Sequence, residues 1–233
     1  MANIFEEDAY KKEIITKIKE IDKDNKSIEL EDTIFYGKSG GQPGDIGEIL
    51  IQGVRIEVKN TIKSEGSIKN ILENIDGLEV NQEIGVKINW DKRYKHMRMH
   101  SALHLMCAAI PLGVTGGQIG FEKSRLDFND PDKKIKKEEL EDKINKLMKD
   151  DHQIIYELID SKIIESQPDL VRTMSVKPPK IDGKLRFVKI GDIDFQPCGG
   201  THVKSTIEIG EIKIGKVENK GKMNRRVNIL LND

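Results

Sequence analysis

Three histidines and a cysteine recur within one short stretch, HMRMHSALHLMC, at residues 96–107. At roughly 100° per residue, a helix would bring all four of these side chains to one side. Two imidazoles at positions i and i+4 form an arrangement that zinc sites commonly use. A histidine pair in a helix is more often incidental than ligating, so this stretch alone raises the question of metal binding and leaves it open.

A second stretch, QPCGGTHV at residues 196–203, supplies a cysteine and a histidine on either side of two glycines. Glycines let the backbone turn tightly around a bound ion. Zinc prefers four nitrogen or sulfur ligands, and two histidines from the helix complete that number. We therefore predict one Zn²⁺ per chain, bound by His100, His104, Cys198 and His202.

Two further side chains of the first stretch are excluded from the predicted site. Cys107 shares the helical face, but a free cysteine on an apolar helix side is usually a small core residue. His96 lies one turn earlier, close to Arg98, and we expect it to be solvated. Four protein ligands would make a closed structural site, whereas three ligands and a water would leave a Lewis-acid position. The residues alone leave both forms open.

The elements that would position these residues change type near Trp90. Residues 11–90 contain short alternating apolar stretches separated by glycine-rich breaks, which predict a small antiparallel barrel. A helical pattern follows from Lys92 to Ile110 and is ended by Pro111. This change of period divides the chain into predicted domains 1–89 and 90–233.

The second predicted domain mixes helices and strands, so the fold class is α+β. Asn129, Asp130 and Pro131 form a helix-start signal before the amphipathic segment KKEELEDKINKLMKD. HQIIYELI, LRFVKIGDIDF, STIEIGEIKIGKVE and RRVNILL are predicted strands.

Composition limits the classes of function. The chain has 233 residues, 34% of them charged, with a net charge of −1, which argues against coating nucleic acid by bulk charge. No apolar run reaches the roughly 20 residues of a membrane span, and the acidic start is unlike a signal peptide. Two cysteines make no disulfide framework. We expect a cytoplasmic protein with no membrane association and no obligate protein partner.

The two metal motifs identify a family. HSALH, followed at long range by CGGTH, resembles the editing domain of alanyl-tRNA synthetase and the freestanding AlaX alanyl-tRNA editing proteins. DTIFYGKSGGQPGDIG resembles the glycine-rich motif of the larger AlaX proteins, and the stretch from residue 186 to 229 is similar to their C-terminal half. The chain has no room for the aminoacylation domain of a class II synthetase. It therefore resembles a medium-sized AlaX protein acting in trans.

The resemblance implies a fold and a reaction. It implies a translation-factor-like β-barrel followed by a mixed α/β zinc-binding editing domain of the threonyl/alanyl-tRNA synthetase second-additional-domain type. The implied enzyme is a zinc-dependent aminoacyl-tRNA deacylase that needs no ATP. Its implied substrate is mischarged tRNA(Ala), from which it would hydrolyse the 3′ ester of serine and possibly glycine.

Several residues gain candidate roles from the resemblance. Gln118 aligns with a polar position that helps to position substrate or water, although a turn residue is an equal alternative. His202 would be either a zinc ligand or the proton-handling group. Thr115 or Thr201 is a candidate contact for a serine hydroxyl. The family's synthetase form commonly has threonine where this chain has Leu103, which puts a contact from that position in doubt.

Two segments would contact the tRNA substrate. Gly40, Gly41 and Gln42 either bring backbone N–H groups to the substrate or simply form a hairpin turn; a nucleotide-binding P-loop is excluded because Asp32 replaces its first glycine. The basic tail would contact acceptor-stem phosphates, or else would protect a strand edge by charge. Its cations are Lys216, Lys220, Lys222, Arg225 and Arg226.

Two other classes of function compete with editing. In the first, a zinc site closed by four protein ligands would stabilise a tRNA-binding module that has no catalytic activity. Another zinc hydrolase, such as a peptidase, is disfavoured because HxxxH lacks the glutamate that HExxH enzymes use as a base.

Overall fold

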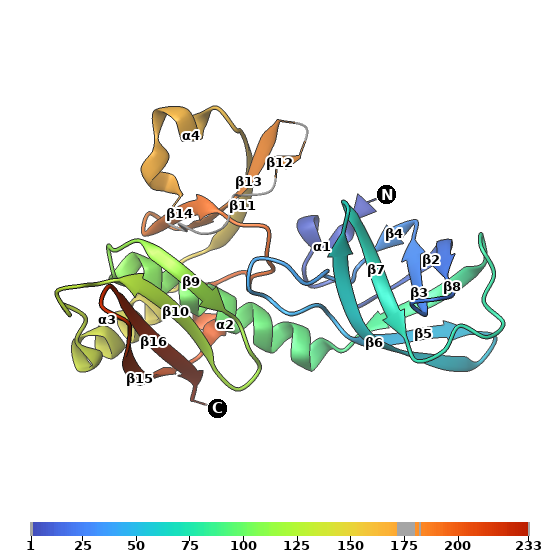
Figure 1. Cartoon of the computed structure of the whole chain (residues 1–233), viewed down its shortest axis with the longest axis horizontal. Coiled ribbons are helices and arrows are strands. Elements are labelled where there is room, and N and C mark those ends of the chain that lie inside the picture. The colour runs from blue at the N-terminus through green and yellow to red at the C-terminus, as the bar shows by residue number, and fades with distance from the viewer. Residues whose placement is uncertain (1, 172–179, 182, 233) are drawn as a thin grey trace. The chain divides into compact units, whose positions relative to one another are not determined.

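The structure is a computed structural model that describes residues 2–171, 180–181 and 183–232. The chain divides into two units, Met1–Lys95 and His96–Asp233, and the division falls within helix α2 (Trp90–Ala109). Figure 1 shows the elements of each unit. The assignment of separate roles to residues 1–89 and 90–233 stays a prediction.

Six antiparallel strands of the first unit close into a barrel in the order β2-β3-β7-β6-β5-β8. Their bounds are β2 (Glu13–Asp22), β3 (Ser27–Leu30), β5 (Gly47–Ile51), β6 (Val54–Ser64), β7 (Ser67–Leu72) and β8 (Glu83–Ile88). Short elements β1 (Ala2–Asn3), α1 (Ile4–Glu7) and β4 (Asp32–Thr33) accompany them. The predicted barrel is thereby confirmed, whereas its likeness to translation-factor domains stays a prediction.

The barrel forms because its strands alternate between the interior and solvent. In β7 and β8 every second residue is buried, which directs one row of aliphatic side chains inward. The interior is aliphatic apart from Phe35. Its buried members are Ile18, Ile28, Leu30, Ile34, Phe35, Ile49, Ile56, Val58, Leu72, Ile84, Val86 and Ile88.

The glycine-rich segment of the first unit is tightly packed at one end and open at the other. A side chain at Gly44 would place its Cβ 1.8 Å from the carbonyl oxygen of Thr61. Asp45 follows and accepts hydrogen bonds from the guanidinium of Arg93, and both side chains are buried. Gly40 and Gly41, by contrast, are exposed and have positive φ.

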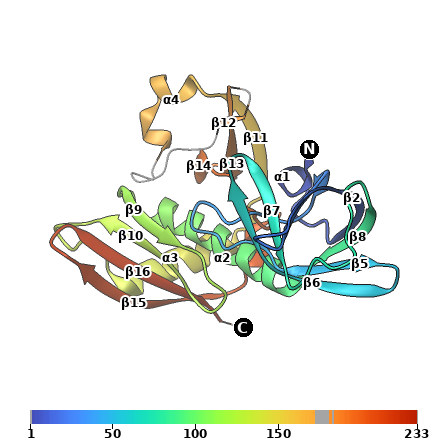
Figure 2. The same ribbon diagram turned by 45° about the vertical axis from the view of Figure 1, so that its right-hand side comes forward.

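Two antiparallel sheets make up the second unit. One has the order β15-β16-β10-β9, and the other has β13 between β11 and β12 with β14 also paired to β13. The strands are β9 (Val114–Gln118), β10 (Ser124–Asn129), β11 (Ile154–Asp160), β12 (Lys180–Ile181), β13 (Lys184–Ile190), β14 (Asp194–Pro197), β15 (Ile212–Lys220) and β16 (Asn224–Leu231). The first of these sheets is recognisable in both ribbon views (Figures 1 and 2).

Helix α3 (Lys137–Lys149) packs on the first sheet. It buries one stripe, Leu140, Ile144 and Met148, at helical spacing. The side-chain amide of Asn145 donates to the carbonyl of Ile212 and accepts from its N–H, which ties the helix to β15. The remaining helices are short: α4 (Ile163–Ser166) and the 3₁₀ helices η1 (Pro168–Leu170) and η2 (Thr206–Ile209).

Two local predictions were wrong. The helix-start signal does not begin a helix: Asn129 ends β10, and the carboxylate of Asp130 accepts N–H groups of Lys134 and Ile135 in a loop. Helix α3 therefore begins later, at Lys137. The first part of the predicted strand STIEIGEIKIGKVE is instead η2, because the Ser205 side chain caps it by accepting the N–H of Ile207.

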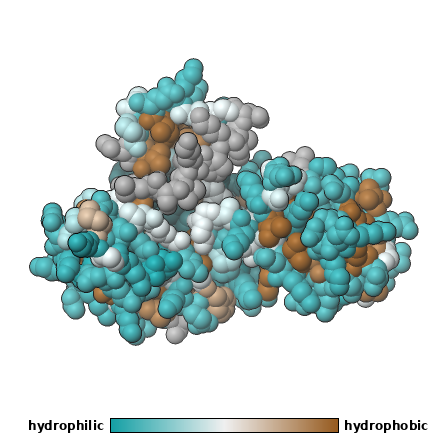
Figure 3. Space-filling model, viewed as in Figure 1, coloured by the Kyte–Doolittle hydropathy of each residue, from teal (hydrophilic) through white to brown (hydrophobic). Residues whose placement is uncertain are grey.

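The surface agrees with the high charge content. Hydrophilic residues predominate on the face drawn in Figure 3, with smaller apolar areas between them. Within the described residues, no helix is long and apolar enough to cross a membrane.

Candidate metal centre

Helix α2 supplies two of the predicted ligands from an enclosed position. Pro111 follows the helix and cannot continue it. Buried apolar side chains lie on several sides of helix α2, namely Met97, Met99, Ala102, Leu103, Leu105 and Met106. His100 and His104, one turn apart, are only 8% and 5% exposed. The helix therefore presents both imidazoles to the protein interior.

The other two predicted ligands lie on a turn that follows β14, which we call the ligand turn (residues 198–202). Its first residue, Cys198, is anchored by a backbone hydrogen bond from its N–H to the carbonyl of Arg186 on β13, at 2.9 Å. Its last residue, His202, is 1% exposed. Pairing of β14 with β13 thus fixes the start of the turn, while its end, His202, lies in the interior.

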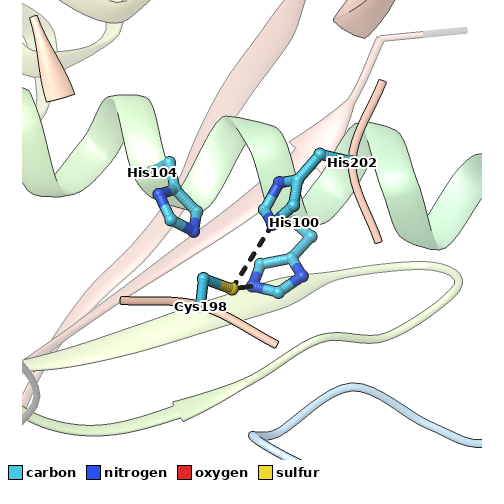
Figure 4. A group of neighbouring side chains, drawn as sticks. All are labelled: His100, His104, Cys198 and His202. Carbon is cyan, nitrogen blue, oxygen red and sulfur yellow. Dashed lines mark hydrogen bonds between the residues drawn. The ribbon is translucent and has the colours of Figure 1, made fainter. Parts of the chain in front are cut away.

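The four side chains converge (Figure 4). Their candidate ligand atoms all lie within 4.8 Å of one another. The sulfur of Cys198 is 3.5 Å from Nε2 of His100 and 3.4 Å from Nε2 of His202. The ring centroids of His100 and His202 are 4.1 Å apart. Residues separated by about a hundred positions in the sequence therefore form one cluster.

Two buried side chains orient the imidazoles. Nδ1 of His104 donates to Oδ2 of Asp194 at 2.7 Å, and the amide of Gln196 also donates to that oxygen. The hydroxyl of Ser101 lies 3.2 Å from Nδ1 of His202. When Nδ1 is occupied in this way, Nε2 is left for a ligand, as is usual for metal-binding histidines.

The cluster favours a deprotonated sulfur. Burial alone would raise the pKa of the Cys198 thiol, but the charges of His100 and His202 and hydrogen bonds from the rings lower it well below its usual range. Burial, reinforced by the charge of His100, lowers the pKa of His202. Burial opposes a proton on His104, yet hydrogen bonds to Asp194 and Cys198 raise its pKa to about 10. A thiolate is the form of cysteine that binds metals.

The residues fit a zinc ion by their chemistry and spacing. Three imidazoles and one thiolate are a donor set that zinc uses in tetrahedral sites. Tetrahedral ligands at about 2.0–2.3 Å from zinc lie roughly 3.5 Å from one another. The sulfur-to-nitrogen distances of 3.4 and 3.5 Å match that separation. The cluster can therefore hold a metal ion.

Of the two residues excluded from the site, one prediction was right and one was wrong. Cys107 is a buried residue outside the cluster, as predicted. His96 also lies outside the cluster, but it is 6% exposed and so is not solvated. The reason is that packing encloses α2 on the side of His96 as well.

Gln118 and Thr201 occupy different surroundings. Gln118 ends strand β9 rather than forming a turn, and its exposed side chain accepts a hydrogen bond from Arg125 at 3.4 Å. Thr201 is fully buried within the ligand turn. The catalytic role of Gln118 and the substrate contact of Thr201 stay predictions.

The predicted tRNA-binding residues differ in how their charges are matched. Lys220 and Lys222 are exposed, at the end of β15 and in the turn after it. Arg226 on β16, however, forms a bidentate ion pair with Asp127: its Nε donates to Oδ1 at 2.7 Å and its Nη2 to Oδ2 at 2.8 Å. Arg225 donates to the side chain of Asn219. In the first unit, Gly40 and Gly41 form an exposed turn closed by hydrogen bonds between Ser39 and Gln42, which matches the hairpin alternative.

Sequence reasoning missed the residues that orient the ligands. Asp194 and Gln196 alternate along β14 just before Cys198, so a period of two would have placed them on one face of that strand. Ser101 gives no such signal, because its partner His202 is remote in the sequence.

Two family models match the chain. The model of the threonyl and alanyl tRNA synthetase second additional domain matches residues 185–228, which include the ligand turn. The model of the class II (A) tRNA synthetases matches residues 3–92.

Relatives that match most of this chain are named as alanyl-tRNA editing proteins or as alanine–tRNA ligases. The alanyl-tRNA editing protein AlaX-M of Methanosarcina acetivorans is 36% identical over 90% of this chain and 91% of its own length. The AlaX-L protein of Pyrococcus horikoshii is 33% identical over 94% of this chain and 55% of its own length. The alanine–tRNA ligase of Pyrococcus abyssi is 32% identical over 92% of this chain, but only 24% of the ligase is covered.

Proposed function

This chain belongs to the family of AlaX alanyl-tRNA editing proteins, and from that membership we propose that it edits mischarged tRNA(Ala) in trans. The proposed reaction is hydrolysis of the ester that joins serine, or glycine, to the 3′ end of the tRNA. A water oxygen adds to the ester carbonyl carbon, the bond to the ribose oxygen breaks, and free amino acid and intact tRNA leave.

Such a reaction meets a physical need. A synthetase pocket that accepts alanine gains little by which to exclude the smaller glycine. An apolar pocket also rejects an added hydroxyl poorly, with discrimination on the order of 100-fold. A second site that hydrolyses the wrong esters restores accuracy.

The observation that carries the proposal is the convergence of His100, His104, Cys198 and His202 in one cluster, in which the three histidines are buried. These residues would hold one Zn²⁺. When bound, the ion would supply Lewis acidity at the ester or would anchor the substrate's amino group. Asp194 and Ser101 lie at Nδ1 of the two rings they touch, which orients each ring and leaves its Nε2 for a ligand.

His202 and Gln118 are proposed to act on the reacting groups. His202 is proposed to act either as the fourth ligand or as the proton-handling group; its Nδ1 faces Ser101 and its Nε2 faces the sulfur of Cys198. Gln118 is exposed, and since its side-chain oxygen accepts from Arg125, we propose that its NH₂ group contacts the substrate or the attacking water. The contact of Thr201 with a serine hydroxyl stays a proposal; the residue is buried within the ligand turn.

For tRNA binding, we propose that Lys220 and Lys222 contact phosphates, with Arg225 beside them. Arg226 contributes less, because Asp127 already matches its charge. A role of Gly40, Gly41 and Gln42 in substrate binding stays a prediction.

Deacylation of tRNA(Ala) charged with serine or glycine tests the proposal. The zinc-loaded protein should release both amino acids or one of them, and Cys198→Ala should lower the rate by more than about 100-fold, since it removes a ligand. Cys107→Ala is the matched control: it removes the other cysteine, which lies outside the cluster, and should keep the rate. If the wild-type protein leaves both esters intact, editing is ruled out.

One observation favours a second candidate function. The cluster offers four protein donors, the number found in closed structural zinc sites. A non-catalytic tRNA-binding module would then bind mischarged and correctly charged tRNA(Ala) alike and release no amino acid from either.

A further inference from the structure

The ligand turn is difficult for the chain to hold in one conformation. Gly199 and Gly200 separate its two ligands, and glycine loses more backbone freedom on ordering than any other residue. Fixing the backbone of each residue in one conformation costs conformational entropy. Other parts of the protein must therefore hold the turn if Cys198 and His202 are to face the helix before a metal binds.

Arg186 on β13 holds the first half of the turn. Its Nη1 donates to the carbonyl oxygens of Cys198 and Gly200, at 2.8 and 2.9 Å. Its own carbonyl accepts the N–H of Cys198. One residue thus contacts the backbone on both sides of Gly199.

Tyr156 on the neighbouring strand β11 holds the second half. Its hydroxyl oxygen accepts the backbone N–H of His202 at 3.2 Å. Its ring also lies under the guanidinium of Arg186, with 3.7 Å between the guanidinium carbon and the ring centroid. Stacking of a cation on an aromatic face is favourable and fixes the guanidinium plane. The two side chains therefore form one unit that contacts both ligand-bearing ends of the turn.

The burial of Arg186 argues against a role in the core alone. The residue is 7% exposed, and its Nε and Nη2 find no hydrogen-bond partner among the described residues. An incompletely bonded, buried cation is costly, and apolar replacements of buried ion groups are often neutral or stabilising. The need to hold the carbonyl groups of the ligand turn explains why position 186 carries an arginine and not a methionine or leucine.

We propose that Arg186 and Tyr156 are a positioning pair that preorganises the ligand turn for the metal. The pair touches no metal; it acts through the backbone of Cys198, Gly200 and His202. This inference rests on the proposed metal site. It adds the residues that make two of the four ligands available in a single arrangement.

Cobalt binding tests the pair without any tRNA. Co²⁺ replaces Zn²⁺ in the purified full-length protein, and the thiolate-to-cobalt absorption band reports Cys198 directly. Arg186→Met should weaken Co²⁺ binding by about 10–100-fold, the usual effect of losing a residue that orients ligands. Tyr156→Phe should weaken it by about 5–10-fold, as expected for one hydrogen bond. Arg186→Lys should recover part of the loss, because an ammonium still donates to the carbonyls.

Lys189→Met is the matched control. It removes a cation from the same strand, but at a position whose side chain faces the other side of the sheet. This variant should bind Co²⁺ like the wild-type protein. Circular dichroism checks that each variant is folded. Should Arg186→Met not fold, Tyr156→Phe, which removes a single oxygen atom, decides the matter. Wild-type affinity and an unchanged band in the folded variants would overturn the positioning pair alone. Absence of the band in the wild-type protein would overturn the metal site and this inference together.

Discussion

At the scale of single residues, the side chains around the cluster divide into those that would bind and those that orient. His104 combines with Asp194 in a carboxylate–histidine pair, and His202 has Ser101. Such partners matter because they fix which ring nitrogen carries the proton. Away from the cluster, the surroundings of Asp127 change its chemistry, because Arg125 and Arg226 both donate to it.

Replacement of Asp127 by asparagine should make stability less dependent on pH. The hydrogen bond from Arg226, together with Arg125 and against the effect of burial, lowers the pKa of Asp127 in the folded state. Its stabilising contribution is therefore present above its unfolded pKa of about 3.9 and is lost as the pH falls through the folded value. At pH 7 the variant should lose about 1 kcal/mol of unfolding free energy, and the difference should vanish at low pH.

Urea unfolding between pH 2 and pH 7 measures this effect. Asp132→Asn is the control, because Asp132 forms an exposed pair with Lys134 and should leave the curve unchanged. Equal stability of Asp127→Asn and the wild type at pH 7 would contradict the prediction.

At the scale of elements, the β15–β16 hairpin carries both matched and unmatched cations. Its register places Glu218 opposite Arg226, and Arg226 also pairs with Asp127 on β10. Lys220 and Lys222, near its turn, are exposed. Only cations that can exchange counterions for phosphates contribute fully to nucleic-acid binding.

The salt dependence of tRNA binding should distinguish these cations. Log affinity falls as log salt rises, and each lysine that contacts a duplex phosphate contributes about 0.9 to the magnitude of that slope. Lys220→Ala combined with Lys222→Ala should therefore reduce the slope by roughly 1.8. Arg226→Gln should change it less, because Asp127 already neutralises that charge. Fluorescence anisotropy with labelled tRNA(Ala) over a series of KCl concentrations gives the slopes; a larger change in Arg226→Gln would contradict this assignment.

At the scale of the whole molecule, all four candidate ligands lie in the second unit, His96–Asp233. The chain's one tryptophan, Trp90, lies in the first unit and packs against the barrel core. Fluorescence therefore reports the barrel, whereas the helical circular dichroism signal includes α3 of the second unit. The two signals therefore weight the two units differently, although α2 contributes helix to both.

Metal removal should destabilise the second unit selectively. A metal at a concentration 1,000 times its Kd stabilises the folded state by about 4.1 kcal/mol, and a chelator removes that contribution. The thermal midpoint seen by circular dichroism should fall on chelation, while the tryptophan transition changes less. Cys107→Ala should respond like the wild type and Cys198→Ala should not respond. An equal shift of both signals in the wild type would show that the metal stabilises both units alike.

The sequence by itself determined the features that depend on local spacing. Histidines at positions i and i+4 face the same way in any helix. Aliphatic residues that alternate along strands form one apolar face, which the barrel encloses. The candidate ligand set followed from residue chemistry, because few side chains other than histidine and cysteine serve zinc. A local signal failed where side chains had competing partners: Asp130 caps a loop rather than a helix.

Only the tertiary structure decided what surrounds each residue. His96 is buried, which no helical pattern reveals. The residues that orient the ligands reach them through strand pairing and packing, most of them from distant parts of the sequence. They are Asp194, Ser101, Arg186 and Tyr156. The charge on Arg226 is matched by Asp127 across a sheet, 99 residues away. Local periodicity reports which way a side chain faces, whereas its partner depends on contacts that form only when distant segments meet.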